Sequence, residues 1–200
     1  MTEQTVSLIN VTKSFDGASV LSGFCAEIDQ NTAIMGTSGK GKTTVARIIM
    51  GILKADGGEV RYAQPPVFSC VFQEDRLFEA FSAVENVAAV CEKKFGKRSA
   101  REHASELLCE LLIDEGDLEK PVCTFSGGMK RRVALARALA KDSNILILDE
   151  AFKGLDSNTR EACADCVRRY AADRLVIMIT HDKEDAELCG ISNFICIDDK

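Results

Sequence analysis

Short runs of apolar residues recur along this chain, and their lengths predict a sheet with helices between its strands. Residues 6–15 and 20–28 are two such runs, joined by a turn at Asp16 and Gly17. Later runs are shorter and mostly apolar, which is typical of strands that are covered on both faces. They lie at residues 32–35, 67–72, 144–148, 175–180 and 193–197.

Apolar residues at helical spacing fill the stretches between these runs. The expected helices span residues 42–53, 83–91, 99–113, 126–140 and 157–171. Strands that alternate with helices favour a mainly parallel sheet, and the first two strands are then expected to form a separate antiparallel layer. Two helices with charged faces suggest a helical insertion at about residues 74–125. We therefore expect one α/β domain over residues 1–200.

The composition is that of an ordinary globular protein, with 46% hydrophobic and 28% charged residues in a chain long enough for one core. No apolar run reaches the length of a membrane helix, and the first residues lack the basic and apolar segments of a signal peptide. Any role at a membrane is therefore expected to come through a partner. The net charge of −6 argues against general nucleic-acid binding.

Nine cysteines are scattered through apolar segments, which favours reduced thiols over a disulfide framework. Cys163 and Cys166 have the C-x-x-C spacing of some redox and metal sites. No second pair matches that spacing, and this pair falls inside an expected helix. We therefore expect both side chains to pack as small apolar residues one helical turn apart.

A glycine-rich loop after the strand at 32–35 fits the pattern G-x-x-x-x-G-K-[ST] at every fixed position. Glycines let backbone N–H groups converge on phosphate oxygens, and the helix that follows adds positive potential. Lys42 is expected to reach the β- and γ-phosphates, and Thr43 to place its hydroxyl on Mg²⁺. A glycine-rich loop without a ligand is the alternative. The expected contacts to the nucleotide are Gly36, Thr37, Ser38, Gly39, Lys40, Gly41, Lys42, Thr43 and Thr44.

Asp149 and Glu150 follow the apolar run 144–148. A phosphate loop requires a second acidic partner, and Asp149 is placed to hold Mg²⁺ through water. Glu150 is placed to orient or deprotonate the attacking water. The alternative is an acidic pair that is merely exposed to solvent. The presence of Glu150 favours hydrolysis of the nucleotide over passive binding.

Residues 125–129 read FSGGM and lie between the phosphate loop and the Asp149–Glu150 pair. In this order the motifs resemble those of the ATP-binding cassette (ABC) family, the motor subunits of transporters, over nearly all 200 residues. Residues 71–78 and 82–87 are similar to those of importer ATPases for nitrate, sulfonate and taurine. The resemblance implies a P-loop NTPase core with a mainly parallel sheet, an N-terminal antiparallel β layer and a helical subdomain.

The resemblance also assigns roles outside the phosphate loop. Gln73 matches the glutamine that senses Mg²⁺ and the attacking water, and His181 matches the histidine that contacts the γ-phosphate. A polar strand end and a structural histidine are the alternatives. Phe15 lies where an aromatic ring stacks on adenine, and a core phenylalanine is an equal alternative. The expected catalytic residues are Lys42, Gln73, Glu150 and His181, and the expected Mg²⁺ ligands are Thr43, Gln73 and Asp149.

Ser126, Gly127 and Gly128 begin a helix whose N–H groups, by the same resemblance, face the γ-phosphate bound by a second chain. Each site would then be built from two chains arranged head to tail. Ser126 is also expected to cap its own helix. Asp156 belongs to a loop that crosses the same interface. The chain departs from the family pattern at Lys40, Phe125, Met129, Arg131 (usually glutamine) and Ala151 (usually proline).

The implied protein is the ATP-hydrolysing subunit of an ABC importer, cytoplasmic and held peripherally on the inner face of the cell membrane. Two cassettes, as a homodimer or a pair of different chains, would close on ATP and Mg²⁺. They would drive permease subunits that bind near Gln73, with an extracytoplasmic solute-binding protein in the full system and no nucleic acid. A C-terminal regulatory domain is not expected. A non-transport ABC ATPase and an ATP-dependent interaction module with little turnover are the alternatives.

Overall fold

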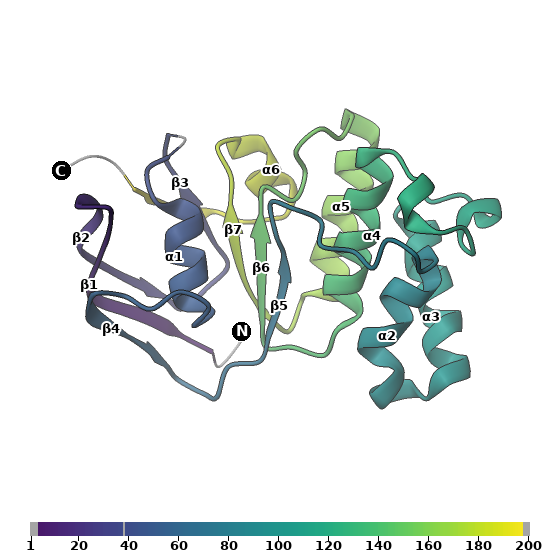
Figure 1. The fold of residues 1–200 in the computed structure, drawn as a ribbon, viewed down its shortest axis with the longest axis horizontal. Helices are drawn as coiled ribbons and strands as arrows, with labels where there is room; N and C mark the ends of the chain where they lie inside the picture. The colour runs from purple at the N-terminus through teal and green to yellow at the C-terminus, as the bar shows by residue number, and fades with distance from the viewer. Residues whose placement is uncertain (1–3, 38, 198–200) are drawn as a thin grey trace.

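Two β-sheets and six α-helices make up the computed structural model, which describes residues 4–37 and 39–197 (Figure 1). The smaller sheet is antiparallel in the order β2-β1-β4. It contains β1 at Val6–Phe15, β2 at Ala18–Ile28 and β4 at Gly57–Tyr62. The hairpin and the antiparallel layer expected from the sequence are therefore confirmed.

The strand β4 is not predicted by the apolar pattern, because its two leading glycines resemble the end of a helix. In the structure Gly57 and Gly58 begin the strand and let it approach β1 closely. A Cβ atom on Gly58 would lie 2.3 Å from the carbonyl oxygen of Asn10, and the φ angle of Gly58 is +78°. Other residues rarely adopt that conformation. The glycines therefore mark a close approach of two strands as well as a turn.

The larger sheet has five strands in the order β5-β6-β7-β3-β8, and their pairings are parallel. This confirms the mainly parallel sheet expected from the alternation of strands and helices. Its strands are β3 at Thr32–Met35, β5 at Phe68–Val71, β6 at Ile145–Asp149, β7 at Leu175–Ile179 and β8 at Asn193–Cys196.

All five expected helices are present, with ends that differ by a few residues. They are α1 at Lys42–Ile49, α2 at Ala83–Phe95, α3 at Lys97–Glu110, α4 at Gly127–Ala140 and α5 at Ser157–Tyr170. A sixth helix, α6 at Lys183–Leu188, is too short to show a clear apolar period, and the sequence does not predict it. None of the helices in residues 4–37 and 39–197 is both long and apolar enough to cross a membrane.

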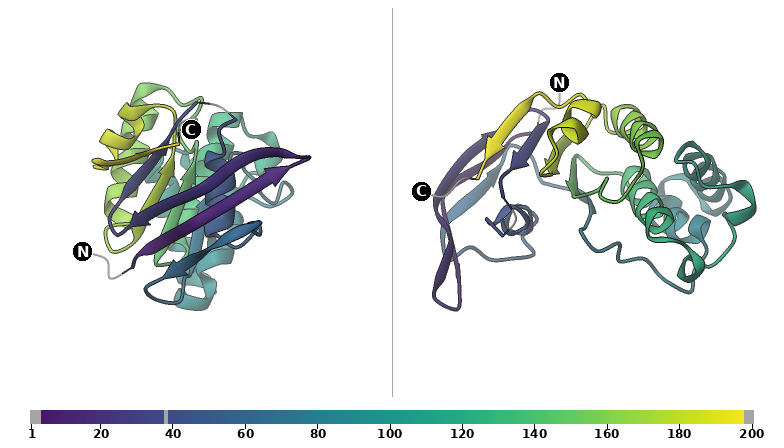
Figure 2. Two further views of the ribbon diagram at one scale, coloured as in Figure 1. Left: turned by 90° about the vertical axis from the view of Figure 1, so that its left-hand side faces the viewer. Right: turned by 90° about the horizontal axis from the view of Figure 1, so that it is seen from above.

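The parallel sheet separates two hydrophobic cores, because its strands are apolar on both faces. Ile145 and Ile147 of β6 pack with α1 and the antiparallel sheet, whereas Leu146 and Leu148 pack with the helical side. Figure 1 shows α1 on one side of the parallel strands and α4 and α5 on the other. The view from above in Figure 2 places α2 and α3 beyond α4, at the end of the molecule opposite the antiparallel sheet.

Parallel pairing also brings the carboxyl ends of four strands to one edge. Val71 of β5 pairs with Leu148 of β6, and Asp149 pairs with Ile179 of β7. Ile179 is in turn the partner of Ile34 in β3. The segments that follow these strands are therefore neighbours, although they lie far apart in the sequence. Ligands of α/β proteins bind at this edge of the sheet.

The two cysteines with C-x-x-C spacing are fully buried in the core on the helical side. Burial raises the pKa of Cys163 to about 12 and that of Cys166 to about 11. A thiolate is the form that binds metals and attacks disulfides, so both groups are held in the unreactive form. These positions accord with a packing role for the pair.

The buried side chain of Asn86 fixes the loop that precedes α2. Its Oδ1 accepts from the N–H of Phe78 at 2.9 Å, and its Nδ2 donates to the carbonyl oxygens of Phe78 and Ser82 at 3.1 and 3.0 Å. Ser82 caps α2 and forms a reciprocal capping box with Glu85. Nδ2 also donates to the carbonyl oxygen of Phe81 at 3.5 Å, so one side chain bonds four backbone groups and sets the path of the chain from β5 to the helices.

Replacing Asn86 with alanine should lower the free energy of unfolding by about 2 kcal/mol, because buried backbone groups lose their partners. Urea denaturation followed by circular dichroism measures the change. Asn158→Ala, at an exposed position of α5, is the matched control and should change stability by less than about 0.5 kcal/mol. Equal stability of the two variants would contradict the anchoring role of Asn86.

Candidate nucleotide-binding and catalytic site

The phosphate loop connects β3 to α1 at the carboxyl edge of the parallel sheet. Gly41 is the N-cap of α1 with a φ angle of +92°, and its carbonyl accepts from the N–H of Val45 at 2.8 Å. A Cβ atom at Gly41 would lie 2.8 Å from Cγ1 of Val20 in β2, so the loop also touches the antiparallel layer. Gly39 has a φ angle of +84°. The loop thus adopts a path that glycine makes possible.

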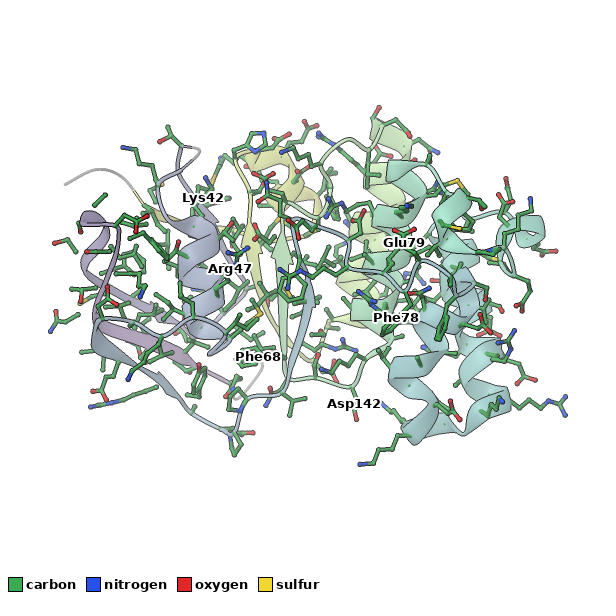
Figure 3. All side chains as sticks on the ribbon, in the orientation of Figure 1. Lys42, Arg47, Phe68, Phe78, Glu79 and Asp142 are labelled. Atoms are coloured by element: carbon green, nitrogen blue, oxygen red, sulfur yellow. The ribbon has the colours of Figure 1, made fainter. Side chains whose placement is uncertain are left out.

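The ammonium group of Lys42 lies inside the curl of this loop. It donates to the carbonyl oxygens of Gly36 at 2.7 Å and Thr37 at 2.9 Å, and only 7% of the residue is exposed. Figure 3 shows Lys42 at the end of α1 that is nearest the carboxyl ends of the strands. A buried cation next to helix N–H groups is suited to an anionic ligand such as phosphate.

Two other loop residues expected to contact ATP are partly buried. Lys40 is half-buried, and its N–H donates to the carbonyl oxygen of Thr37 at 3.4 Å. Thr44 is partly buried in the first turn of α1. Ser38, expected among the ATP contacts, lies outside the described residues. The roles of these residues toward ATP stay predictions.

Thr43 and Asp149 meet across the gap between α1 and β6. The hydroxyl of Thr43 donates to Oδ1 of Asp149 at 3.3 Å, and the carboxylate is 4% exposed. Burial raises the pKa of Asp149 above its usual range, and the charge of Glu150 adds to this, while the Thr43 hydroxyl opposes it. A buried carboxylate and a hydroxyl are oxygen ligands of the kind that Mg²⁺ prefers, so the pair fits that ion.

No group of three or more His, Cys, Asp and Glu side chains within residues 4–37 and 39–197 forms a metal site by itself. Mg²⁺ commonly takes one or two protein oxygens together with water and substrate phosphates. The Thr43–Asp149 pair fits that kind of shared site.

Glu150 lies between two cationic or potentially cationic side chains. Its Oε2 accepts from Nζ of Lys153 at 2.9 Å, and its Oε1 lies 3.8 Å from Nδ1 of His181. The hydrogen bond from Lys153 lowers the pKa of Glu150, and the charges of Lys153, His181 and Lys42 act in the same direction. A cavity of about 160 Å³ opens beside Glu150, Lys153 and His181. An ionised carboxylate at a cavity is the state that a general base requires.

The backbone of Glu150 is in the left-handed region, with a φ angle of 49°. Its N–H donates to the carbonyl oxygen of Ile179 at 2.9 Å, which continues the β6–β7 ladder past the end of the strand. Strained backbone of this kind is concentrated at functional sites. The structure thus turns the chain sharply at the residue that the sequence marks as catalytic.

Gln73 follows β5, next to the strand that carries Asp149 and Glu150. Its side chain is exposed, whereas its carbonyl oxygen accepts from Arg131 of α4 at 2.7 Å. The structure therefore brings Gln73, Glu150, His181 and the phosphate loop to one edge. Their catalytic roles, and Mg²⁺ ligation by Gln73, stay predictions.

Phe15 is at the end of β1, and 44% of it is exposed, so it does not belong to the core. Nζ of Lys13 lies 5.4 Å from the centre of its ring. Phe15 pairs with Ala18 in the hairpin whose Val20 touches the phosphate loop. An exposed ring beside the loop is compatible with adenine stacking, which stays a prediction.

Ser126, Gly127 and Gly128 are not brought to the phosphate loop of the same chain. They begin α4, which lies across the parallel sheet from α1 (Figure 1). The Ser126 hydroxyl accepts from the N–H of Met129 at 3.3 Å, so the expected cap is present. An anion bound at this helix end would therefore have to belong to another molecule or another site.

Asp156 caps α5. Its two carboxylate oxygens accept from the N–H of Thr159 at 3.0 Å and from the Thr159 hydroxyl at 2.7 Å, which lowers the pKa of Asp156. A Cβ atom on Gly128 would lie 3.6 Å from Cδ2 of Leu155, so this loop lies beside the start of α4. A contact of Asp156 across an interface stays a prediction.

Sequence reasoning did not identify Lys153 as a neighbour of Glu150. The sequence shows only a lysine three residues after Glu150. Its side chain reaches back to Glu150 because the chain turns at that residue. In the sequence Arg131 stands out only because the family usually has a glutamine at this position. The structure places the Arg131 guanidinium on the backbone of Phe72 and Gln73.

A protein-family model described as ABC transporter matches residues 22–153. The chain is 38% identical over 185 residues to the aliphatic sulfonates import ATP-binding protein SsuB 3 of Rhodococcus jostii, covering 90% of this chain and 67% of that protein. It is 33% identical over 199 residues to the spermidine/putrescine import ATP-binding protein PotA of Mycoplasma capricolum, covering 93% of this chain and 57% of that protein.

Solved structures agree with the sequence relatives. The dimeric bacterial ABC transporter cassette MJ0796 superposes with a TM-score of 0.84 at 26% identity, covering 96% of this chain and 94% of that one. Its post-hydrolysis dimer with ADP and phosphate has a TM-score of 0.82 at 28% identity, covering 96% and 93%.

Replacing Lys153 with glutamine should raise the pKa of Glu150, because the ammonium that stabilises its carboxylate is removed. As the pH falls, the Glu150 carboxyl should then take up its proton at a higher pH than in the wild type. Carbon-13 NMR of labelled glutamate measures the titration, with Glu150→Gln to assign the signal. Lys120→Gln, which breaks an ion pair of the same i, i+3 spacing with Asp117 outside the site, is the control. An unchanged titration in Lys153→Gln would contradict the ion pair.

Proposed function

This chain belongs to the ABC transporter family and is an ATP-hydrolysing cassette, and we propose that it powers import through a partner permease. Two cassettes would close on two ATP molecules with Mg²⁺ and reopen after hydrolysis. The protein would be cytoplasmic and held at the inner face of the membrane by the permease. Its importer role rests on relatives that are named as import ATP-binding proteins.

One observation carries the two-chain arrangement. Lys42, Glu150 and His181 lie at the carboxyl edge of the sheet, whereas the helix end at Ser126 lies on the other side of the sheet from α1. A helix N-terminus that presents glycines and N–H groups is suited to an anion. Two copies arranged head to tail would supply each nucleotide with the phosphate loop of one chain and the α4 end of the other.

The protein groups would act mainly by positioning and by electrostatic stabilisation. Lys42 would exchange the loop carbonyls for phosphate oxygens, since its ammonium already lies inside the curl. Thr43 and Asp149 would hold Mg²⁺, which supplies charge neutralisation on the phosphates when bound. Glu150 would accept a proton from the attacking water, and His181 would donate to the γ-phosphate.

A surface for the permease lies between the parallel sheet and α2. Phe78 and Phe81 are 57% and 47% exposed, and their ring centres are 5.4 Å apart. Exposed aromatic pairs are common anchors of protein interfaces. Figure 3 shows Phe78 and Glu79 on the helical side of the parallel sheet. Since this loop continues directly from Gln73, a partner seated there would act close to the proposed catalytic edge.

Mg²⁺-dependent ATP hydrolysis by the purified protein over a series of protein concentrations tests the proposed function. Specific activity should rise with protein concentration, because each site needs two chains. Lys42→Ala should abolish it, since the buried cation is lost. Activity without any concentration dependence would contradict the two-chain site. ATP binding without turnover would favour the interaction module instead, and absence of ATP binding would overturn the proposal.

Replacing Phe78 and Phe81 together with serine should reduce stimulation of ATP hydrolysis by the permease, measured in vesicles that contain the assembled transporter. Each variant is compared with its own rate in the absence of permease. Ile52→Ser is the matched control, because Ile52 is also 57% exposed but follows α1. Equal stimulation of the Phe78/Phe81 variant and the control would contradict docking at the aromatic pair.

A further inference from the structure

Three basic side chains of α4 hold the loop at residues 72–79, which is called here the Gln73 loop. Lys130 donates to the carboxylate of Glu79 at 3.0 Å, and Arg137 donates to the carbonyl oxygen of Asp75 at 3.2 Å. Between them Arg131 contacts the start of the loop. The loop leaves β5 and is therefore bonded along its length to a helix that lies far away in the sequence.

Arg131 makes the most specific of these contacts. Its guanidinium donates to the carbonyl oxygens of Phe72 at 2.8 Å and Gln73 at 2.7 Å, and its Nε lies 3.2 Å from Oδ1 of Asp75. The Arg131 side chain is 11% exposed and that of Asp75 is 22% exposed. Oδ1 of Asp75 accepts no hydrogen bond, and burial raises the pKa of this carboxyl group, so the firm contacts of Arg131 are its two hydrogen bonds to backbone carbonyl oxygens.

The two carbonyl groups belong to the peptide units on either side of the Cα atom of Gln73. One planar guanidinium thereby fixes the backbone on both sides of that atom and leaves the Gln73 side chain free of it. Arginine presents several donors in a rigid fork. The glutamine usual at position 131 in this family has one uncharged amide, and lysine has one compact ammonium group.

We propose that Arg131 is a positioning residue that ties the backbone of Gln73 to α4, so that Gln73 follows the helix that begins at Ser126. This rests on the proposed function, in which Gln73 serves the chain's own ATP and Ser126 serves that of the partner. A movement of α4 when its N-terminus engages the partner's nucleotide is then passed to Gln73. The tether therefore links the two ATP sites of a dimer through one chain.

A double-mutant cycle with Gln73 separates this role from a structural one. Arg131→Gln should lower kcat on the order of tenfold, as small misplacements at an active site do, with little change in KM for ATP because Lys42 is untouched. In a Gln73→Ala background the same substitution should leave kcat nearly unchanged, since the residue it positions is absent. Arg131→Lys should recover only part of kcat, because it keeps the charge without the fork.

The control is Arg98→Gln, which removes an arginine whose side chain is 93% exposed in an ion pair on α3. It should leave kcat at the wild-type value. An equal loss of kcat for Arg131→Gln in both backgrounds, no loss in either, or full recovery by Arg131→Lys would overturn the proposal.

Hydrogen exchange of the nucleotide-free protein tests the tether without turnover. Amides of residues 72–79 should exchange faster in Arg131→Gln than in the wild type or Arg98→Gln. Faster exchange in a protein that hydrolyses no ATP would leave the tether standing and refute the proposed function. Unchanged exchange in a protein that hydrolyses ATP would refute the tether alone.

Discussion

The parallel pairing of β6 with β5 on one side and β7 on the other is the constraint on which the rest of the molecule depends. It sets Leu148 beside Val71 and Asp149 beside Ile179, so the segments that leave these strands meet at one edge. Wholly apolar strands can pair in this way because both faces of the sheet are covered. The acidic pair, Gln73 and His181 owe their proximity to this register and not to their distance in the sequence.

The same sheet divides the functional groups into two halves. The helix α1, which follows the phosphate loop, packs against the face that Ile145 and Ile147 line, whereas α4 packs against the face of Leu146 and Leu148. The glycines at the start of α4 are thereby kept from the phosphate loop of their own chain. A second copy would bring the missing helix end, and the Gln73 loop connects the two halves within each chain.

Local patterns in the sequence predict a large part of this arrangement. The Ile-Leu-Ile-Leu run predicts a strand buried on both faces, and the glycine pattern predicts the loop that holds Lys42. What the patterns miss depends on tertiary contacts. Gly58 resembles a turn residue in the sequence, because Asn10, which its backbone approaches closely, is far away in the sequence. The sequence does not reveal the partners of Lys153 and Arg131, since the carboxylate and the carbonyl groups that they bind are brought to them only by the fold.

In the proposed dimer the α4 end of one chain completes the nucleotide site of the other. Sedimentation of Glu150→Gln with Mg²⁺ and ATP tests it most directly, because this variant should bind ATP without consuming it. A site shared by two chains predicts a particle of twice the monomer's mass with one ATP per chain, and a monomer that still binds ATP when Ser126→Arg is added. An ATP-bound monomer in Glu150→Gln alone, or a dimer unaffected by Ser126→Arg, would contradict it.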